Sequence, residues 1–364
     1  MRAAIFREAH QPLSIDEVAI DDPRDREVLI RTVASGVCHS DLHILEGTVQ
    51  GGRPPLVLGH EGAGVVEAVG PLVSHVKPGD HVVTCLSTFC GHCDQCLTGH
   101  PYLCQASPTA RARGAEPRMQ MGDETVRGFL GLGTFAERML VHENAVVGID
   151  PEIPLEVACL VGCGVLTGVG AVLRSAQVEA GQTVAVFGCG GVGLSIIQGA
   201  AIARASRIIA IDRMPAKLDL ARSLGASDTI DSSQAEVVAA VKELTGGRGV
   251  DHAFEAVGVP GLVRQAAETL AVRGTCTIVG VPPDGSVFEI PYGAIRPDCR
   301  IQTCRMGSNR FRIDIPQYLD FYRRGWLRLD ELVSQRSGLD GVNDAFASMQ
   351  AGVGARTVLL FGAI

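Results

Sequence analysis

The feature that most constrains the fold is a glycine-rich stretch between a predicted strand and a predicted helix. Residues 183–188 read TVAVFG, and residues 188–193 read GCGGVG before an apolar helical pattern that extends to about residue 205. G-x-G-x-x-G in this context is typical of dinucleotide sites. Gly188 permits the tight turn, Gly190 lets a pyrophosphate approach the backbone, and Gly193 allows close helix packing. The amides and positive dipole at the helix N-terminus suit phosphate groups.

An acidic residue ends the next predicted strand. Residues 207–212 read RIIAID and finish at Asp212. A carboxylate at this position accepts hydrogen bonds from the adenosine ribose and repels a 2′-phosphate, which favours NAD over NADP. Lys217 is near enough in sequence to reach the ribose as well, whereas the adjacent Arg213 weakens the argument against NADP.

The sequence pattern changes near residue 183. Earlier apolar segments such as 3–6, 13–20 and 27–35 are short and separated by turns, which indicates a mainly β region. Later segments alternate between strand and helix patterns, which implies a parallel sheet covered on both faces. With 364 residues the chain is long enough for two domains, and we expect an α/β protein.

Four cysteines lie close together in a segment, 90–128, that shows no strand or helix pattern of its own. They are spaced C-x2-C-x2-C-x7-C, at Cys90, Cys93, Cys96 and Cys104. Four thiolates suit a structural, tetrahedral zinc site, because they leave no coordination position open. An iron–sulfur cluster is the alternative, although the last spacing departs from the usual ferredoxin run.

A second group of metal-binding residue types is dispersed. His60 and Glu61 open a glycine-punctuated apolar stretch, residues 59–70, while Cys38 and Cys163 lie far away in the sequence. Two thiolates and one imidazole would leave the fourth position of a zinc ion open, as in catalytic sites. Sequence alone does not bring these residues together. Taken singly, Cys163 in an apolar run is more often a small buried hydrophobic residue, and His60 a histidine with satisfied hydrogen bonds.

Composition narrows the class of protein. A net charge of −8 argues against a general nucleic-acid binder. Residues 157–173 form an uncharged run at the short limit for a membrane span and contain several glycines, so we expect a buried core segment and no membrane partner. The first residues lack the long apolar core of a secretory signal, so we expect a cytoplasmic enzyme. In that compartment the twelve cysteines are expected to be free thiols or metal ligands and not a disulfide framework.

These motifs together resemble the zinc-dependent medium-chain alcohol dehydrogenases over nearly the whole chain. The family signature G-H-E-x2-G-x5-G fits Gly59, His60, Glu61, Gly64 and Gly70, and the other motifs follow in family order. The resemblance implies a GroES-like, mainly β catalytic domain that binds zinc, at 1–164 and 305–364. It also implies a doubly wound Rossmann domain for NAD, at 165–304.

The resemblance implies roles at a catalytic zinc ion and a second, structural one in each subunit. The catalytic ligands would be Cys38, His60 and Cys163, and the structural ligands would be Cys90, Cys93, Cys96 and Cys104. Asp41 would orient the imidazole of His60. Glu61 would be an acidic neighbour that ligates the metal during exchange.

The resemblance also implies a proton relay and two binding surfaces. Ser40 would accept the alcohol proton and His43 would pass it to solvent. The dinucleotide would contact His39, Thr167, Gly188, Gly190, Gly191, Val192, Gly193, Asp212, Arg213, Lys217 and Arg356. An apolar substrate channel would be lined by Leu86, Phe129 and Leu130.

The function implied is the interconversion of a primary alcohol, aromatic or allylic, and its aldehyde by hydride transfer to and from NAD. The alternative is a formaldehyde dehydrogenase that acts on the S-hydroxymethyl conjugate of a thiol. The acidic pair of glutathione-type members is not evident in residues 44–55. Arg111, Arg113 and Arg118 would either hold an anionic conjugate or form a solvated charged loop.

Two further readings stay open. One is a non-enzymatic protein that kept the fold, and another is an enzyme that holds NAD tightly and passes electrons to an external acceptor. We call the segment that carries Cys90, Cys93, Cys96 and Cys104 the four-cysteine lobe. Family members with a long segment after this lobe, here 105–128, tend to be dimers. We therefore expect a homodimer that meets along an edge of the cofactor-domain sheet, with a homotetramer as the alternative.

Overall fold

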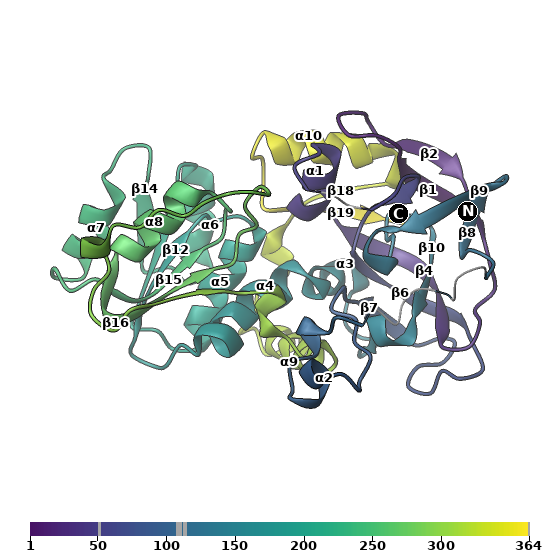
Figure 1. Ribbon diagram of the computed structural model, residues 1–364, viewed down its shortest axis with the longest axis horizontal. Coiled ribbons are helices and arrows are strands. Elements are labelled where there is room, and N and C mark those ends of the chain that lie inside the picture. The colour runs from purple at the N-terminus through teal and green to yellow at the C-terminus, as the bar shows by residue number, and fades with distance from the viewer. Residues whose placement is uncertain (50–51, 107–110, 112–114, 363–364) are drawn as a thin grey trace. The chain divides into compact units, whose positions relative to one another are not determined.

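The computed structural model describes residues 1–49, 52–106, 111 and 115–362. These residues form two compact units (Figure 1). The first contains Met1–Cys163, Arg310–Asp320 and Leu329–Ile364, and the second contains Gly164–Asn309 and Phe321–Arg328. The division therefore differs from the expected boundary at residue 305, because residues 305–309 and 321–328 group with the second unit. Gly307, for example, packs against the backbone of Gly170 in that unit.

The first unit is mainly β, as expected. Among the described residues, one sheet has the order β2-β1-β5-β9-β8-β3 and another has the order β11-β7-β6-β4-β19-β18, with β10 paired to β4. The strands of the first are β1 Arg2–Phe6, β2 Ser14–Glu17, β3 Ala19–Ile20, β5 Leu56–Val57, β8 Met119–Met121 and β9 Glu124–Gly128. Those of the second are β4 Glu27–Gly36, β6 Glu61–Val69, β7 His81–Thr84, β10 Arg138–His142, β11 Val146–Gly148, β18 Val333–Ser337 and β19 Arg356–Leu360.

Short helices accompany these sheets. They are α1 His39–Leu45, α2 Asp94–Leu97, α3 Leu155–Ala158 and α10 Val342–Gln350, together with the 3-10 turns η1 Pro101–Leu103, η2 Phe129–Gly131, η3 Glu143–Ala145, η4 Cys159–Gly162, η8 Asp330–Leu332 and η9 Leu339–Gly341. Helix α9, Phe311–Arg323, crosses the boundary between the units at residue 320. Ile5, Phe135 and Phe346 from β1, the segment before β10 and α10 share one buried cluster.

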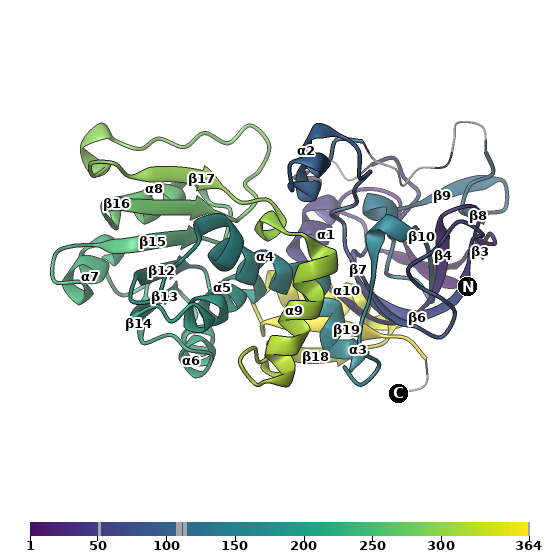
Figure 2. The ribbon, with the colours of Figure 1, turned by 90° about the horizontal axis from the view of Figure 1, so that it is seen from below.

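The second unit is a doubly wound α/β domain. Its parallel sheet has the order β14-β13-β12-β15-β16-β17, which Figure 2 shows from edge to edge. The strands are β12 Thr183–Phe187, β13 Arg207–Asp212, β14 Asp228–Asp231, β15 Val250–Glu255, β16 Leu270–Ile278 and β17 Arg300–Thr303. The helices are α4 Gly164–Gly170, α5 Gly191–Ile202, α6 Pro215–Ser223, α7 Val237–Leu244 and α8 Pro260–Glu268, with shorter helices η5 Ala171–Ala176, η6 Tyr292–Ala294 and η7 Met306–Ser308.

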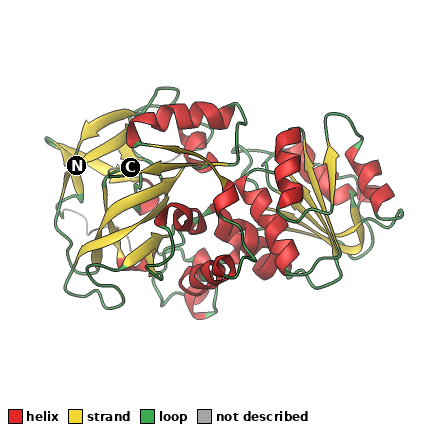
Figure 3. Ribbon diagram, turned by 180° about the vertical axis from the view of Figure 1, so that it is seen from behind, coloured by secondary structure: helices red, strands yellow, loops and turns green. Residues whose placement is uncertain are grey.

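Helices flank this sheet on both faces (Figure 3), which accounts for the continuous apolar strands. Ala185, Phe187, Ile209 and Phe254 are all buried in the sheet. The strand order reverses between β12 and β15, and in sheets of this kind a ligand binds outside the carboxyl ends at such a point.

The uncharged run at 157–173 is buried, as the sequence predicts. Residues 157–172 are buried throughout. Within the described part of the chain, no single helix has the length and apolarity to cross a membrane. One bent pair, Leu155–Gly162 with Gly164–Ala176, meets the length and composition criteria together.

Candidate functional site

The fold of the first unit brings the dispersed metal-binding residues together. Cys38 precedes α1, His60 precedes β6, and Cys163 follows η4. Ligand atoms of these three residues and of Glu61 all lie within 4.8 Å of one another. His60 and Glu61 are fully buried, and each cysteine is only 6% exposed.

Glycines make this arrangement sterically possible. Gly59, at a φ of +85°, turns the chain into His60, and a Cβ there would lie 2.5 Å from the side chains of Thr134 and Phe135. At Gly162 a Cβ would overlap the carbonyl oxygen of Thr84, so η4 lies directly on the end of β7. Gly36 leaves the space that the Glu61 carboxylate occupies. Each of these glycines admits a close approach that any larger residue would block.

Asp41 lies beside the imidazole of His60, where the resemblance implies that it orients the ring. Oδ1 of Asp41 lies 3.3 Å from Nδ1 of His60 and accepts a 2.9 Å hydrogen bond from the backbone N–H of Gly59. Nε2 of His60 is buried and has no hydrogen-bond partner among the described residues. Because Asp41 engages Nδ1, Nε2 is the nitrogen left to bind a metal.

The electrostatics of the group favour an ionised thiol. The pKa of the Cys38 thiol lies well below its ordinary value because Cys163 donates a hydrogen bond to it, in spite of the burial that opposes ionisation. Burial disfavours the charged form of His60, but the Asp41 carboxylate and Cys38 outweigh that effect and raise the His60 pKa to about 10. Two soft sulfur donors and a buried imidazole fit a zinc ion with one open position, and binding the ion would displace the proton from Nε2 of His60.

Arg356 and Glu61 form a buried ion pair beside this group. The arginine is expected to contact the pyrophosphate of the dinucleotide and Glu61 to neighbour the metal. In the structure the guanidinium of Arg356 binds the carboxylate of Glu61 directly. Sequence reasoning missed this contact, since the two residues are 295 positions apart.

The relay residues lie on α1. Ser40 is half-buried, with its Oγ 3.8 Å from Sγ of Cys38, and His43 is half-buried one turn further along. His39, the first residue of α1, is exposed. Ser40 is therefore next to the metal-binding group, and the roles of Ser40, His43 and His39 remain predictions.

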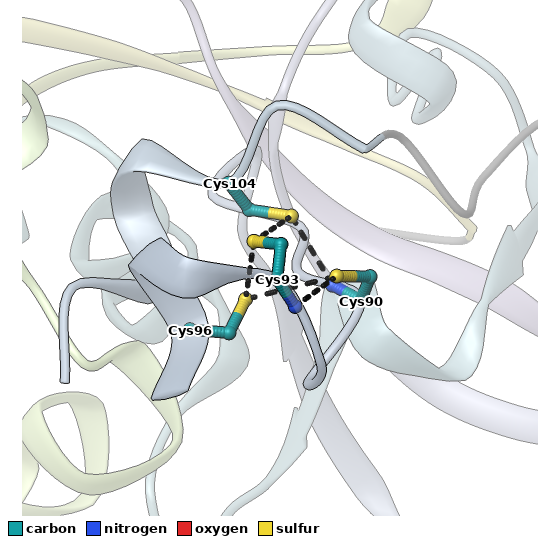
Figure 4. A group of neighbouring side chains, drawn as sticks. All are labelled: Cys90, Cys93, Cys96 and Cys104. Atoms are coloured by element: carbon teal, nitrogen blue, oxygen red, sulfur yellow. Dashed lines mark hydrogen bonds between the residues drawn. The ribbon is translucent and has the colours of Figure 1, made fainter. Parts of the chain in front are cut away.

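The four-cysteine lobe also converges. Sγ of Cys93 lies 3.5 Å from Sγ of Cys96 and 3.8 Å from Sγ of Cys104, while Sγ of Cys90 is 3.9 Å from Sγ of Cys96 (Figure 4). Backbone N–H groups point at these sulfurs, including those of His92 and Cys93 at Cys90. The amide of His92 is the largest influence on Cys90 and helps to lower its pKa to about 6. Four convergent sulfurs with amide donors fit a closed zinc site.

The glycine-rich turn has the geometry that a dinucleotide requires. Gly188 has a φ of +94°, and a Cβ on Gly190 would meet nothing within 4 Å, which leaves its backbone open. A Cβ on Gly193 would overlap the carbonyl oxygen of Gly188, so only glycine allows α5 to start here. Oδ2 of Asp212 accepts a 2.8 Å hydrogen bond from the Cys189 amide. The turn therefore leaves an open backbone cradle beside a carboxylate, which suits a pyrophosphate and an adenosine ribose.

Five further predicted cofactor residues, one of them on α4, also belong to the second unit. Gly191 and Val192 begin α5 and are half-buried, Arg213 is exposed, and Lys217 is half-buried on α6. Thr167 is nearly buried on α4, and its hydroxyl lies 3.5 Å from Sδ of Met306. Their contacts with a dinucleotide remain predictions.

The three predicted substrate residues differ in exposure. Phe129 is buried, and its ring meets the imidazole of His60 edge-on, with centroids 5.8 Å apart. Leu130 is 44% exposed and adopts a left-handed conformation, with φ at 54°. Leu86 is half-buried after β7. Of the three, Phe129 lies beside a predicted metal-ligand residue, and the roles of Leu86 and Leu130 remain predictions.

Two arginines in the described part of the segment after the lobe, Arg111 and Arg118, are bound to carboxylates. Arg111 binds the carboxylate of Glu27 at 2.6 and 2.9 Å and Asp21 at 2.6 Å, and Arg118 binds Glu27 at 2.7 Å. Glu27 is only 4% exposed. Both arginines are thus engaged with carboxylates, which corrects the reading of a solvated charged loop. Arg113 lies outside the described residues.

Comparison with known proteins agrees with this geometry. Residues 24–152 match the model of the alcohol dehydrogenase GroES-like domain, and residues 191–324 match that of the zinc-binding dehydrogenase. The S-(hydroxymethyl)glutathione dehydrogenase of Haemophilus influenzae is 38% identical, and the match covers 98% of this chain and 96% of the relative. The NDMA-dependent alcohol dehydrogenase of Amycolatopsis methanolica is also 38% identical, with 100% and 99% covered.

A solved structure supports the same conclusion. The benzyl alcohol dehydrogenase of Acinetobacter calcoaceticus has a TM-score of 0.92 and 31% identity, and the match covers 99% of each chain. The likeness spans both units, and together with the two convergent metal-binding groups of this chain it supports an oxidoreductase that uses zinc and a nicotinamide dinucleotide. The chain belongs to the zinc-dependent medium-chain alcohol dehydrogenase family.

Proposed function

We propose that this enzyme interconverts a primary alcohol with an apolar, aromatic or allylic side chain and its aldehyde, with NAD as the hydride carrier. The observation that carries this proposal is the edge-on contact of Phe129 with His60. A buried aromatic ring beside a metal-ligand residue favours an apolar substrate, because burying apolar surface releases water. The benzyl alcohol dehydrogenase relative supports the same substrate class.

The residues of the first unit have distinct tasks in this proposal. A zinc ion held by Cys38, His60 and Cys163 would supply a Lewis acid that makes the alcohol easier to deprotonate. Ser40, next to Cys38, accepts the alcohol proton, and His43 passes it on. Asp41 keeps Nε2 of His60 directed at the metal position. Phe129 and Leu86 exclude water around the reacting carbon.

The second unit serves as the NAD-binding domain, and the first as the catalytic domain. Asp212 supports NAD over NADP, because its carboxylate lies at the end of β13 and is bound to the fingerprint amide of Cys189. Arg356 neutralises the buried Glu61, and its contact with the pyrophosphate stays a prediction from the resemblance.

Oxidation of an S-hydroxymethyl thiol conjugate is the second candidate. The Haemophilus influenzae relative favours it by name and by 38% identity. The structure gives less support, because Arg111 and Arg118 are engaged by Glu27 and Asp21 and are not positioned as an open anion site. A conjugate of a thiol other than glutathione fits better, because the acidic pair of glutathione-type members is not evident in residues 44–55.

We also propose a homodimer that forms along β17, the edge strand of the second unit's sheet. Apolar side chains are exposed on and before this strand: Ile301 is 41% exposed, Val287 71% and Tyr292 94%. An unpaired edge strand with apolar neighbours favours pairing with a second copy. Light scattering on the purified protein, which separates the dimer from the monomer and the tetramer, tests this proposal.

The experiment that tests the function is a substrate panel with NAD. Benzyl, allylic and straight-chain alcohols are compared with formaldehyde, each with and without added thiols, at equal enzyme concentration. We expect the highest kcat/KM with benzyl or allylic alcohols and no dependence on thiol. Turnover that requires both formaldehyde and a thiol would establish the second candidate instead.

A parallel set of assays adds NDMA as electron acceptor. It tests whether NDMA supports turnover of this enzyme, as it does by name for the Amycolatopsis methanolica relative, and whether NAD stays bound to the protein between turnovers. Turnover with NDMA but without added NAD would show tightly held cofactor. Free exchange predicts that activity follows the added NAD.

A further inference from the structure

Glu255 occupies a conspicuous place in the second unit. It is the last residue of β15, and it pairs with Phe187, the residue before Gly188 of the glycine-rich turn. The strand order reverses between these two strands, so Glu255 stands where a sheet of this kind binds its ligand. Its side chain, however, is completely buried and therefore does not reach a ligand directly.

The carboxyl group of Glu255 organises the turn that follows it. Oε1 accepts hydrogen bonds from the backbone N–H groups of Val257, Gly258 and Val259, at 2.9, 2.7 and 3.4 Å. Oε2 is buried without a hydrogen-bond partner among the described residues. Burial raises the pKa of this carboxyl, although the three amides oppose that effect. A buried acid is costly, so its presence needs a compensating role.

Glycines join this turn to the next one along the sheet. Gly258 has a φ of +89°, and a Cβ there would lie 2.5 Å from the carbonyl oxygen of Val281. A Cβ on Gly280 would overlap the amide of Gly258 and would lie 2.7 Å from Oε2 of Glu255. The turns after β15 and β16 are therefore packed against each other around the Glu255 carboxyl.

The packing of these two turns fixes the position of one apolar side chain, that of Val257. Val257 is 46% exposed, although it is a valine in a close-packed part of the domain. Its Cγ2 lies so near Gly188 that a Cβ on that glycine would overlap it. The turn that Glu255 holds thus sets Val257 over the first glycine of the fingerprint, at the edge where the dinucleotide binds.

We propose that Glu255 is a positioning residue for the cofactor: its buried carboxyl fixes residues 256–259 so that Val257 forms an apolar wall against the bound nucleotide. Glu255 acts through the backbone amides and Val257 acts by contact. This inference rests on the proposed function in one respect: the proposed preference for NAD decides that NADH is the molecule used to measure binding. It predicts an effect on cofactor binding that is separate from the alcohol chemistry.

The test measures NADH binding by fluorescence titration without alcohol, together with the NADH emission maximum and the KM values for NAD and for alcohol. The variants are Glu255→Ala, Glu255→Gln and Val257→Ala. Glu268→Gln serves as the control, since Glu268 forms a partly exposed pair with Arg264 on the same unit. If the parent enzyme binds NADPH more tightly than NADH, the titrations use NADPH instead. A preference for NADPH would overturn the proposed preference for NAD, but it would leave the proposed role of Glu255 unchanged.

We expect Glu255→Ala to weaken NADH binding about tenfold, the factor that one lost hydrogen-bonding group gives. Val257→Ala should weaken it about threefold to tenfold through lost apolar contact, with an altered emission maximum and an unchanged Tm. Glu255→Gln should restore binding to near the parent value, because its amide oxygen accepts the same three hydrogen bonds. The KM for alcohol should stay constant in every variant.

Either of two results would overturn the proposal. One is an unchanged NADH affinity in Val257→Ala, which does not depend on whether the Glu255→Ala variant folds. The other is a Glu255→Gln variant that is as defective as Glu255→Ala, because the carboxyl would then act by its charge and not by accepting the amides.

Discussion

The two metal sites of the first unit are built in opposite ways. The four-cysteine lobe takes its ligands from one short segment, residues 90–104, and all four cysteines are partly exposed. The other site takes Cys38, His60 and Cys163 from distant parts of the chain, and these residues are nearly or fully buried. The lobe has four sulfurs, whereas the buried site has two sulfurs, an imidazole and a neighbouring carboxylate.

This difference in construction indicates which site contributes to the stability of the protein and which contributes to its chemistry. In the lobe the polypeptide depends on the metal, because the segment has little apolar core of its own and only short helical turns at α2 and η1. At the buried site the metal depends on the polypeptide, because sheets and glycine contacts have already placed the ligands. We therefore expect metal loss to affect stability at the lobe and chemistry at the buried site. The predictions follow in order of their expected effect on turnover.

The largest effect should come from His60→Ala or Cys163→Ala. Losing a ligand of the buried site removes the Lewis acid, so we expect kcat/KM to fall by at least about 10³-fold, or several kcal/mol of transition-state stabilisation. NADH binding should largely survive, because the glycine-rich turn is unaltered. Zinc content, activity and NADH titration are measured on the same sample. Retained activity in either variant would refute the assignment of the buried site as the catalytic zinc centre.

A smaller effect is expected from Asp41→Asn. The amide no longer offers the imidazole a charged acceptor at Nδ1, so we expect metal affinity or activity to fall about 10-fold to 100-fold. Excess zinc in the assay should restore part of the activity, whereas it should not rescue His60→Ala. Glu67→Gln, on the same strand as Glu61 but paired with Arg138, is the matched control. Equal loss in the control would show a general effect of removing a carboxylate.

The contrast between the sites also explains what the sequence predicted. The lobe and the glycine-rich turn are contiguous, so spacing and flanking patterns alone identified them. Cys38, His60 and Cys163 needed the resemblance to a family, because the contacts that unite them depend on Gly36, Gly59 and Gly162 as spacers in the folded chain. The contact of Arg356 with Glu61 was missed because no local pattern signals a pair between distant strands.

The segment after the lobe is a second region whose structure the local sequence pattern did not predict. Residues 105–128 have no clear strand pattern, yet β8 and β9 pair as a hairpin there. Their strands are short and carry methionine, glutamine and charged residues, so the tertiary environment decides their conformation. Burial of Glu27 likewise depends on Arg111 and Arg118, which lie far along the chain.

Removing a lobe ligand, as in Cys93→Ser, should act mainly on stability. We expect loss of one zinc per subunit and a Tm lower by at least about 5 °C, which corresponds to about 2 kcal/mol for a unit of this size. At low temperature kcat should stay within about threefold of the parent, since no sulfur of the lobe belongs to the buried site. Calorimetry and zinc analysis measure these effects. If kcat vanished while the Tm held, the two sites would not be separable as proposed.

The smallest effect on turnover should come from Glu27→Gln, which tests whether the segment after the lobe is also held by charge. Burial opposes ionisation of Glu27, but Arg111 and Arg118 outweigh it and lower its pKa to about 2 from an ordinary value of 4.5. Because the folded pKa is the lower one, the carboxylate adds stability above pH 4.5, and that stability is lost as the pH falls toward 2. The variant should therefore be less stable at pH 7 by roughly 2–3 kcal/mol, with a flatter decline in acid and unchanged kcat. Denaturant unfolding between pH 7 and pH 3 measures the slope, and an identical slope in Glu27→Gln and the parent would show that the charge of Glu27 does not stabilise this part of the chain.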